Sequence, residues 1–365
     1  MKHLHLIAAN PHPHLIAANT HAHLIRLPLK RLLACALIAA MLAGGTLCHH
    51  TYRQHLRAQA QAESPFIRWV DFNPSSAALT LALELDIASH TDVAAGNSTI
   101  SVNWIDLLAY TAAKLGGNFR HYKAYTMQDA YTKLRDGVPL SELTAKLKHF
   151  AYYQEAFTAV LGGLVGAFEE EAPDGAGGTH WQSRYGLMAF SPIAKGFPYQ
   201  DYDDFGVNRS YGYERRHLGH DMMGQVGTPI VAVEGGTVEA LGWNQYGGWR
   251  IGIRSADGKR YYYYAHLRRN YPYVKWLQEG GTVQAGDVIG YLGRTGYSKT
   301  ENVNNIEEPH LHFGLQLIFD ESQREGDGEI WVDVYALTQF LAQHRSAVAK
   351  EEGGKEYWRI YEIRG

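Results

Sequence analysis

Four histidines and one aspartate in the second half of this 365-residue chain have the spacing of metal ligands and proton carriers. His217 and Asp221 lie four residues apart, and His310 and His312 lie two apart. Because side chains repeat with a period of two along a strand, His310 and His312 would share one face of any strand. His266 lies between the two groups. Two histidines and one carboxylate are a common ligand set for a catalytic zinc ion with one open position, and the remaining histidines would be free to move protons.

The sequence around these residues resembles the lysostaphin/LytM-type zinc metallopeptidases. That family carries an H-x-x-x-D motif, a middle histidine and a terminal H-x-H on a β-rich domain. The resemblance spans about residues 205–320, roughly a third of the chain. The further matching segments, in the family order, are 205–209, 227–233, 235–238, 264–267, 285–290 and 293–296.

The resemblance implies a role for each residue of the first pattern. His217, Asp221 and His312 would hold one Zn²⁺ per chain. His266 and His310 would act in catalysis by transferring protons. The sequence has no H-E-x-x-H motif, so it offers no glutamate base of the helical zinc-peptidase kind.

Three residues near the first motif have two interpretations each. Tyr211 and Tyr213 could donate a hydrogen bond to the oxyanion of the reaction or contact the substrate, or they could be aromatic side chains that pack beside the site. His220 stands where relatives tend to carry an aliphatic residue. We expect it to be structural, with a substitute metal ligand as the alternative.

Composition restricts the class of protein. Hydrophobic residues make up 45% of the chain and charged residues 19%, as in a globular protein. The net charge of −3 argues against a nucleic-acid partner, which would require a basic face. The two cysteines, Cys35 and Cys48, both lie in an apolar N-terminal run. The rest of the chain therefore has no disulfide and no thiolate metal site.

The N-terminal region predicts a targeting segment. Residues 1–31 contain a histidine-rich near repeat, and we expect them to be a disordered leader or sequence upstream of the true start. Residues 32–48 are an uncharged run behind a basic flank, which predicts a signal-anchor or a signal peptide, with an uncleaved anchor preferred. The catalytic domain would then lie outside the cytoplasm, held at the cell membrane by a single pass, or secreted if the segment is cleaved.

The rest of the chain predicts an α+β protein with more than one domain. Residues 63–170 are predicted to be a helical domain: one helix follows Ser75, another ends at Gly116, and a long one covers 140–168. Residues 171–190 are predicted to be a linker because they are acidic and rich in glycine.

Residues 191–342 are predicted to be the all-β peptidase domain, built from an antiparallel sheet in a barrel-sandwich-like form. The hairpin signal at Asp257-Gly258 supports this prediction. In the run 261–264, the even-numbered tyrosines are predicted to share a face with His266. The polar loop 297–308 could form one wall of the cleft, and 343–365 is predicted to be a tail.

Three functions are compatible with these patterns. The first is a zinc endopeptidase that cuts the peptide stems or cross-bridges of bacterial peptidoglycan, a substrate class implied by the resemblance. The second is a catalytically silent LytM-like scaffold that binds or activates another wall hydrolase during division or sporulation, with the helical domain contacting that partner. The third is a bifunctional hydrolase with Glu84 as the general acid of a glycosidase. The presence of every ligand favours the first.

Overall fold

The computed structural model describes residues 70–365 of the chain, apart from 211–213, 325 and 327. The predictions for the leader and for the segment 32–48 lie outside the described residues. None of the helices in the described part combines the length and apolar character that a membrane span needs.

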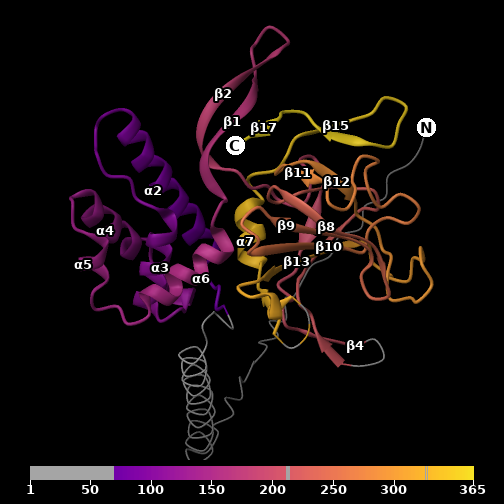
Figure 1. Cartoon of the computed structure of the whole chain (residues 1–365), viewed down its shortest axis with the longest axis horizontal. Coiled ribbons are helices and arrows are strands. Elements are labelled where there is room, and N and C mark those ends of the chain that lie inside the picture. Colours follow the sequence, from indigo (N-terminus) through magenta and orange to yellow (C-terminus); the bar gives the residue numbers. More distant parts are fainter. Residues whose placement is uncertain (1–69, 211–213, 325, 327) are drawn as a thin grey trace, which may run out of the picture. The chain divides into compact units, whose positions relative to one another are not determined.

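The first part of the described chain, up to Leu161, is helical, as predicted (Figure 1). The Ser75 side chain accepts a hydrogen bond from the backbone N–H of Ala78 and so caps the first helix. Gly116 ends the second helix in the left-handed conformation, at φ +59°. The helices are α2 (Ser76–Ala94), α3 (Trp104–Leu115), η1 (Phe119–His121), α4 (Ala124–Arg135), α5 (Leu140–Thr144) and α6 (Phe150–Leu161).

The single long helix predicted over 140–168 and the linker predicted over 171–190 are both wrong. The helical stretch is broken into α5 and α6, and α6 ends at Leu161. The chain then forms an antiparallel hairpin of β1 (Val165–Pro173) and β2 (Thr179–Leu187). The glycine-rich segment between the strands is its turn, in which Asp174 accepts hydrogen bonds from the N–H groups of Ala176 and Gly178.

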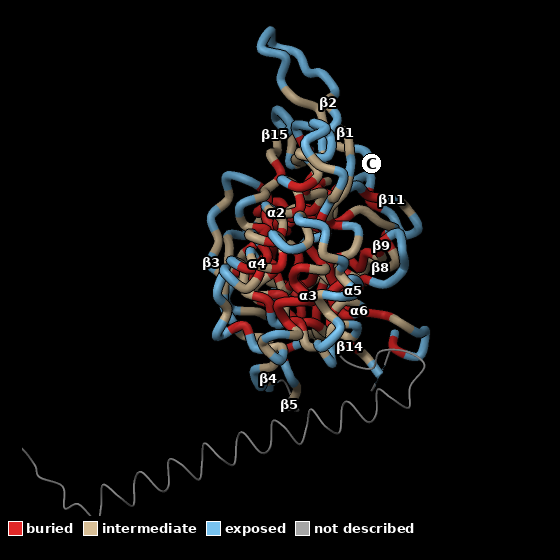
Figure 2. The backbone as a smooth tube through the Cα atoms, turned by 90° about the vertical axis from the view of Figure 1, so that its left-hand side faces the viewer, coloured by how far each residue is buried: buried red, intermediate tan, exposed pale blue. Residues whose placement is uncertain are grey.

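The C-terminal segment is part of the folded structure, in contrast to the tail predicted over 343–365. β17 (Ile363–Arg364) pairs with β1 of the hairpin. β15 (Val348–Lys350) and β16 (Tyr357–Arg359) form a small sheet of their own. The hairpin extends away from the buried interior, and its turn and the start of β2 are exposed, as the tube in Figure 2 shows.

The remainder of the chain is predominantly β, which confirms the coarse prediction for this domain. Its main sheet is antiparallel, with the strand order β11-β8-β9-β10-β13-β6-β3, and β14 pairs with β13. β7 pairs with β12, and β4 pairs with β5, in two-stranded sheets. The elements are β3 (Tyr199–Asp201), β4 (Asn208–Ser210), β5 (Glu214–Arg216), β6 (His220–Gly224), β7 (Pro229–Val231), β8 (Gly236–Asn244), β9 (Gly248–Ser255), β10 (Arg260–Ala265), β11 (Thr282–Val283), β12 (Val288–Tyr291), β13 (His310–Leu317), η2 (Glu321–Gln323), β14 (Ile330–Val332) and α7 (Tyr335–Leu341).

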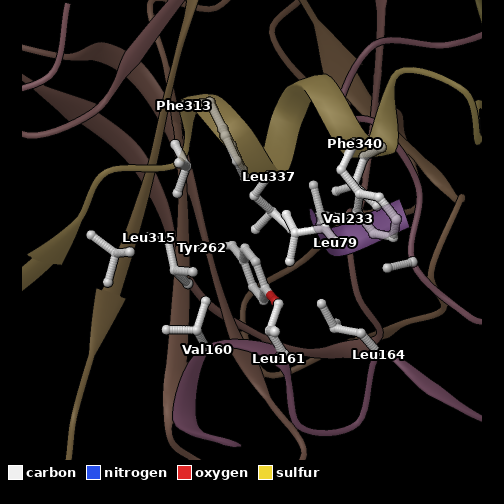
Figure 3. Packing of buried hydrophobic residues seen from close by; sticks show 14 of the residues in the cluster. Leu79, Val160, Leu161, Leu164, Val233, Tyr262, Phe313, Leu315, Leu337 and Phe340 are labelled. Carbon is white, nitrogen blue, oxygen red and sulfur yellow. The ribbon is translucent and has the colours of Figure 1, made fainter. Parts of the chain in front are cut away.

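The helices and the main sheet share one hydrophobic core. Tyr262 and Phe313 project from the buried face of the sheet, and their rings stack at 6.3 Å. Figure 3 shows them close to Leu337 of α7, Leu79 of α2 and Leu161 of α6. The described residues from 70 onward accordingly belong to one compact unit. The opposite face of the sheet is left to carry the polar site.

Candidate metal centre and active site

The three predicted metal ligands converge at the start of two paired strands. Asp221 of β6 lies directly opposite His312 of β13 in the antiparallel register. His217 precedes β6, and its Nε2 lies 2.8 Å from His312 Nδ1 and 3.1 Å from Asp221 Oδ1. His312 Nδ1 is also 3.1 Å from Asp221 Oδ1. One ligand atom from each residue therefore faces a common point, with all three atoms within 4.8 Å of one another.

The residue types and the spacing of these atoms fit a zinc ion. Zinc is bound by imidazole nitrogens and carboxylate oxygens in a tetrahedral arrangement. Three such donors fill three of the four positions and leave the fourth open. Gly219 allows the donors to approach each other, since a Cβ at this position would lie 2.6 Å from the His312 ring. The glycine between the two residues of the first motif is thus a requirement of the site.

Asp204 orients His217 and was not predicted. His217 Nδ1 lies 3.1 Å from the Asp204 carbonyl oxygen and 3.2 Å from its carboxylate. These acceptors hold the proton on Nδ1 and leave Nε2 to face the other ligands. Burial alone would lower the pKa of His217, but hydrogen bonds to Asp204 and Asp221 outweigh burial and raise it to about 9. The single signal in the sequence was the position of Asp204 just before the 205–209 segment.

Arg209 fixes the carboxylate of Asp221. Its guanidinium contacts Asp204 Oδ2 at 2.5 Å and Asp221 Oδ2 at 3.0 Å. Asp221 therefore presents Oδ1 to the histidines. Burial would raise the pKa of Asp221, but hydrogen bonds from His217 and His312 hold it well below its usual range. Like Asp204, Arg209 was not assigned a role from the sequence.

The two predicted proton carriers lie beside the metal ligands. The ring centroids of His266 and His310 are 4.8 Å apart, and His266 lies 5.8 Å from His312. His266 Nδ1 is 2.9 Å from the carbonyl oxygen of Thr295, and His310 Nδ1 is 2.8 Å from that of Glu308. A carbonyl can only accept, so in the neutral rings both Nδ1 atoms carry the proton and both Nε2 atoms are basic. Burial lowers the pKa of His266 well below its usual value, which favours the neutral form.

The predicted orientation of the tyrosine run is wrong. Tyr262 and Tyr264 lie in the core, whereas the Tyr263 ring is 5.9 Å from that of His312. β10 ends at Ala265, and His266 takes a left-handed conformation with φ +62°. The alternation therefore stops one residue before His266, whose ring turns toward the site.

The remaining residues that the sequence suggested for the site have different outcomes in the structure. Tyr211 and Tyr213 lie outside the described residues. His220 stands apart from the metal cluster, with Nε2 at 2.8 Å from Asp201, as a structural histidine would. Glu84 is exposed on α2, and its buried neighbour Asp86 instead binds the backbone N–H of Trp104, which is a packing role.

The loop predicted to border the site does reach it. The ring of Tyr297, at the start of the loop 297–308, lies 5.7 Å from that of His266. Further along, Asn302 accepts a hydrogen bond from the indole N–H of Trp249 at 2.9 Å and so ties the loop to β9.

Residues 215–324 match Peptidase family M23, so this part of the chain is an M23 domain, and the resemblance to lysostaphin/LytM-type peptidases is confirmed.

Similarity to individual proteins is confined to part of the chain. It is 37% identical over 124 residues to the L-Ala–D-Glu endopeptidase of Bacillus subtilis strain 168, covering 34% of this chain and 36% of that protein. It is 36% identical over 120 residues to lysostaphin of Staphylococcus staphylolyticus, covering 33% of this chain and 21% of that protein. The match thus spans about a third or less of each relative's length.

Among solved structures, one is of a proposed glycyl-glycine endopeptidase lytM from Ruminococcus gnavus ATCC 29149. It is 23% identical and covers 73% of this chain and 88% of that one, with a TM-score of 0.47.

Proposed function

We propose that this chain is a zinc-dependent endopeptidase that hydrolyses peptide bonds in the stems or cross-bridges of peptidoglycan. The observation that carries the proposal is the convergence of His217, Asp221 and His312 within an M23 domain. The substrate class is supported by the names of relatives, among them a peptidoglycan DD-endopeptidase, ShyC, of Vibrio cholerae that is 34% identical over 102 residues.

The site residues divide the chemistry between them. His217, Asp221 and His312 would hold the zinc ion, which when bound supplies Lewis-acid polarisation of the scissile carbonyl. His266 and His310 present basic Nε2 atoms next to that point. In our proposal one of them takes a proton from the attacking water and returns it to the leaving amine, and the other, in its doubly protonated form, donates from Nε2 to the oxyanion.

The completeness of the ligand set favours an enzyme over a silent scaffold. We further propose, on the sequence pattern of 32–48, that the domain works outside the cytoplasm at the cell membrane. Contact with another wall or division protein through the helices is part of the scaffold alternative.

Substitution of a metal ligand tests the proposal. His217→Ala and Asp221→Ala should each abolish zinc binding and the release of peptides from purified bacterial cell wall. Zinc is measured by elemental analysis of the purified chain, and the new amino termini by mass spectrometry of the released fragments.

Glu84→Gln is the matched control, because this carboxylate is exposed on α2. It should leave peptide release intact. Release of reducing sugar ends from peptide-free glycan strands by the wild type, lost in this variant, would revive the glycosidase hypothesis. Full activity in either ligand variant would rule out the zinc assignment. A wild-type chain with neither zinc nor cleavage would favour the scaffold.

A further inference from the structure

Two arginines near the site have no carboxylate partner among the described side chains. Arg215 lies on β5 and Arg250 on β9, and neither forms an ion pair with any side chain that the structure describes. The Nε of each is buried and has no hydrogen-bond partner. By contrast, Arg254 on β9 pairs with Glu239 at 2.7 and 3.0 Å. Arg359 also has an unpartnered buried Nε, but its guanidinium pairs with Asp287 and Glu362. Buried guanidinium donors are normally satisfied, so Arg215 and Arg250, which have no described carboxylate partner either, are the ones available to a ligand.

Arg250 lies on the face of the main sheet that carries the metal ligands. Gly252 is directly opposite Tyr263 in the antiparallel register, and Arg250 is two residues from Gly252 on the same strand. Because strand side chains alternate, Arg250 shares the face of Tyr263, whose ring contacts His312. The intervening Ile251 points into the core on the other face.

Arg215 is held beside the proposed proton carrier His266. Its guanidinium donates to the hydroxyl of Tyr297 and lies 5.3 Å from the Tyr297 ring and 5.9 Å from the Tyr246 ring. Tyr297 in turn contacts His266. Two aromatic faces position the side chain and leave its positive charge uncompensated.

Both charges act on the same residue of the sheet. Burial raises the pKa of Tyr263, and the nearby guanidinium groups of Arg250 and Arg215 oppose that rise. Tyr263 therefore lies near both cations, and its ring contacts that of His312. A negatively charged group placed over Tyr263 would meet both cations.

We propose that Arg215 and Arg250 bind a free carboxylate of the peptide substrate close to the scissile bond, and so select acidic peptides over uncharged ones. The guanidinium fork matches the geometry of a carboxylate. This inference rests on the proposed peptidase function and adds the charge of the substrate. The names of two relatives imply substrates of different charge: an L-Ala–D-Glu endopeptidase cuts next to an acidic residue, and the glycyl-glycine endopeptidase ALE-1 of Staphylococcus capitis cuts between uncharged ones. Under this proposal the substrate of this chain is acidic, like that of the first.

Synthetic peptides with and without a carboxylate test the inference. The probes are three forms of N-acetyl-L-Ala-D-Glu: one with a free side-chain carboxylate, one with a free α-carboxylate and one with both amidated. The wild-type zinc enzyme should show a KM about 10–100-fold lower for one of the acidic forms, as expected for a hydrogen bond to a charged group. The form that is preferred identifies which carboxylate is bound.

Variants assign the preference to the two arginines. Arg215→Gln and Arg250→Gln should each remove most of the difference, because the KM for the acidic peptide rises toward the KM for the fully amidated one. Arg254→Gln is the matched control from the same strand and should keep the wild-type preference. Arg215→Lys retains the charge without the fork and should keep part of the preference, which a folding defect would not produce.

Binding without catalysis separates this inference from the proposed function. Calorimetric titration of the EDTA-treated full chain with the same peptides should show tighter binding of the acidic form, weakened by salt. Discriminating binding without hydrolysis would support the carboxylate site and contradict the peptidase. Hydrolysis with equal KM values for all three peptides would overturn the carboxylate site and leave the peptidase intact.

Discussion

At the scale of single residues, His217 is held by two carboxylates with different tasks. Asp204 accepts from Nδ1, whereas Asp221 lies on the Nε2 side among the proposed metal ligands. In the absence of metal both carboxylates stabilise the protonated ring, which is why its pKa rises to about 9. His217 is 3% exposed, so solvent screens these interactions only weakly.

The stability of the metal-free protein should therefore depend on pH. The folded-state pKa of His217 lies above its ordinary value of 6.5, so its contribution is fully present below pH 6.5 and is lost as pH rises through 9. The shift corresponds to ~3 kcal/mol. Denaturant unfolding of EDTA-treated protein at pH 6 and pH 9.5 measures the loss.

Asp204→Asn is the control for that measurement. Removing this carboxylate lowers the pKa of His217 and should flatten the pH dependence over the same interval. An identical slope in the variant and the wild type would show that Asp204 does not act on His217 in this way.

At the scale of elements, local signals predicted well and long-range contacts did not. Ser75 and the glycine at 116 mark the ends of helices through chemistry within a few residues, and both positions are confirmed. The spacing of His310 and His312 likewise predicted a strand. The hairpin β1–β2 was missed because its glycine-rich turn also has the composition of a linker.

The same distinction applies to the site. The metal cluster could be predicted because the family motif names its members. The contribution of Asp204 could not, because it reaches His217 across 13 residues that include the paired strands β4 and β5. The direction of the His266 ring depends on its positive φ, so it cannot be predicted from the alternation of side chains along a strand.

The turn that supports His266 gives a prediction at this scale. Gly296 has φ +125°, and a Cβ there would lie 2.5 Å from the Tyr246 carbonyl and 3.0 Å from His266 Nδ1. Gly296→Ala should therefore destabilise the fold by about 2–4 kcal/mol through strain and overpacking, and displace His266. The midpoint temperature of thermal unfolding and the rate of peptide hydrolysis should both fall.

Gly258 provides the comparison, since its φ is +74° and no atom lies within 4 Å of the Cβ position. Gly258→Ala should cost about 1–2 kcal/mol from backbone strain alone and leave hydrolysis unchanged. Equal effects of the two substitutions would refute the steric argument at Gly296.

At the scale of the whole described unit, a buried ion pair joins the helices to the sheet. Arg260 of β10 pairs with Glu234 at 2.8 and 2.9 Å and donates to the carbonyl of Ala159 near the end of α6 at 3.0 Å. Tyr262 donates to the same carboxylate at 2.7 Å. The helices thus share both a core and a polar network with the peptidase sheet, and we expect the two parts to unfold together.

Arg260→Ala should break this connection. Arg260 is 1% exposed, and its removal leaves the Glu234 carboxylate buried without its main partner, at a cost of about 3–5 kcal/mol. Arg254→Ala removes a partly exposed ion pair on the neighbouring strand and should cost only about 1 kcal/mol, because Glu239 keeps Arg324 as a partner. Far-UV circular dichroism reports mainly on the helices, and tryptophan fluorescence includes Trp243 and Trp249 in the sheet. Both signals should show one coincident transition, shifted to lower denaturant by Arg260→Ala. Separate transitions in the wild-type protein would mean that the helices fold independently, and the network would then be a contact between two domains instead of part of one cooperative core.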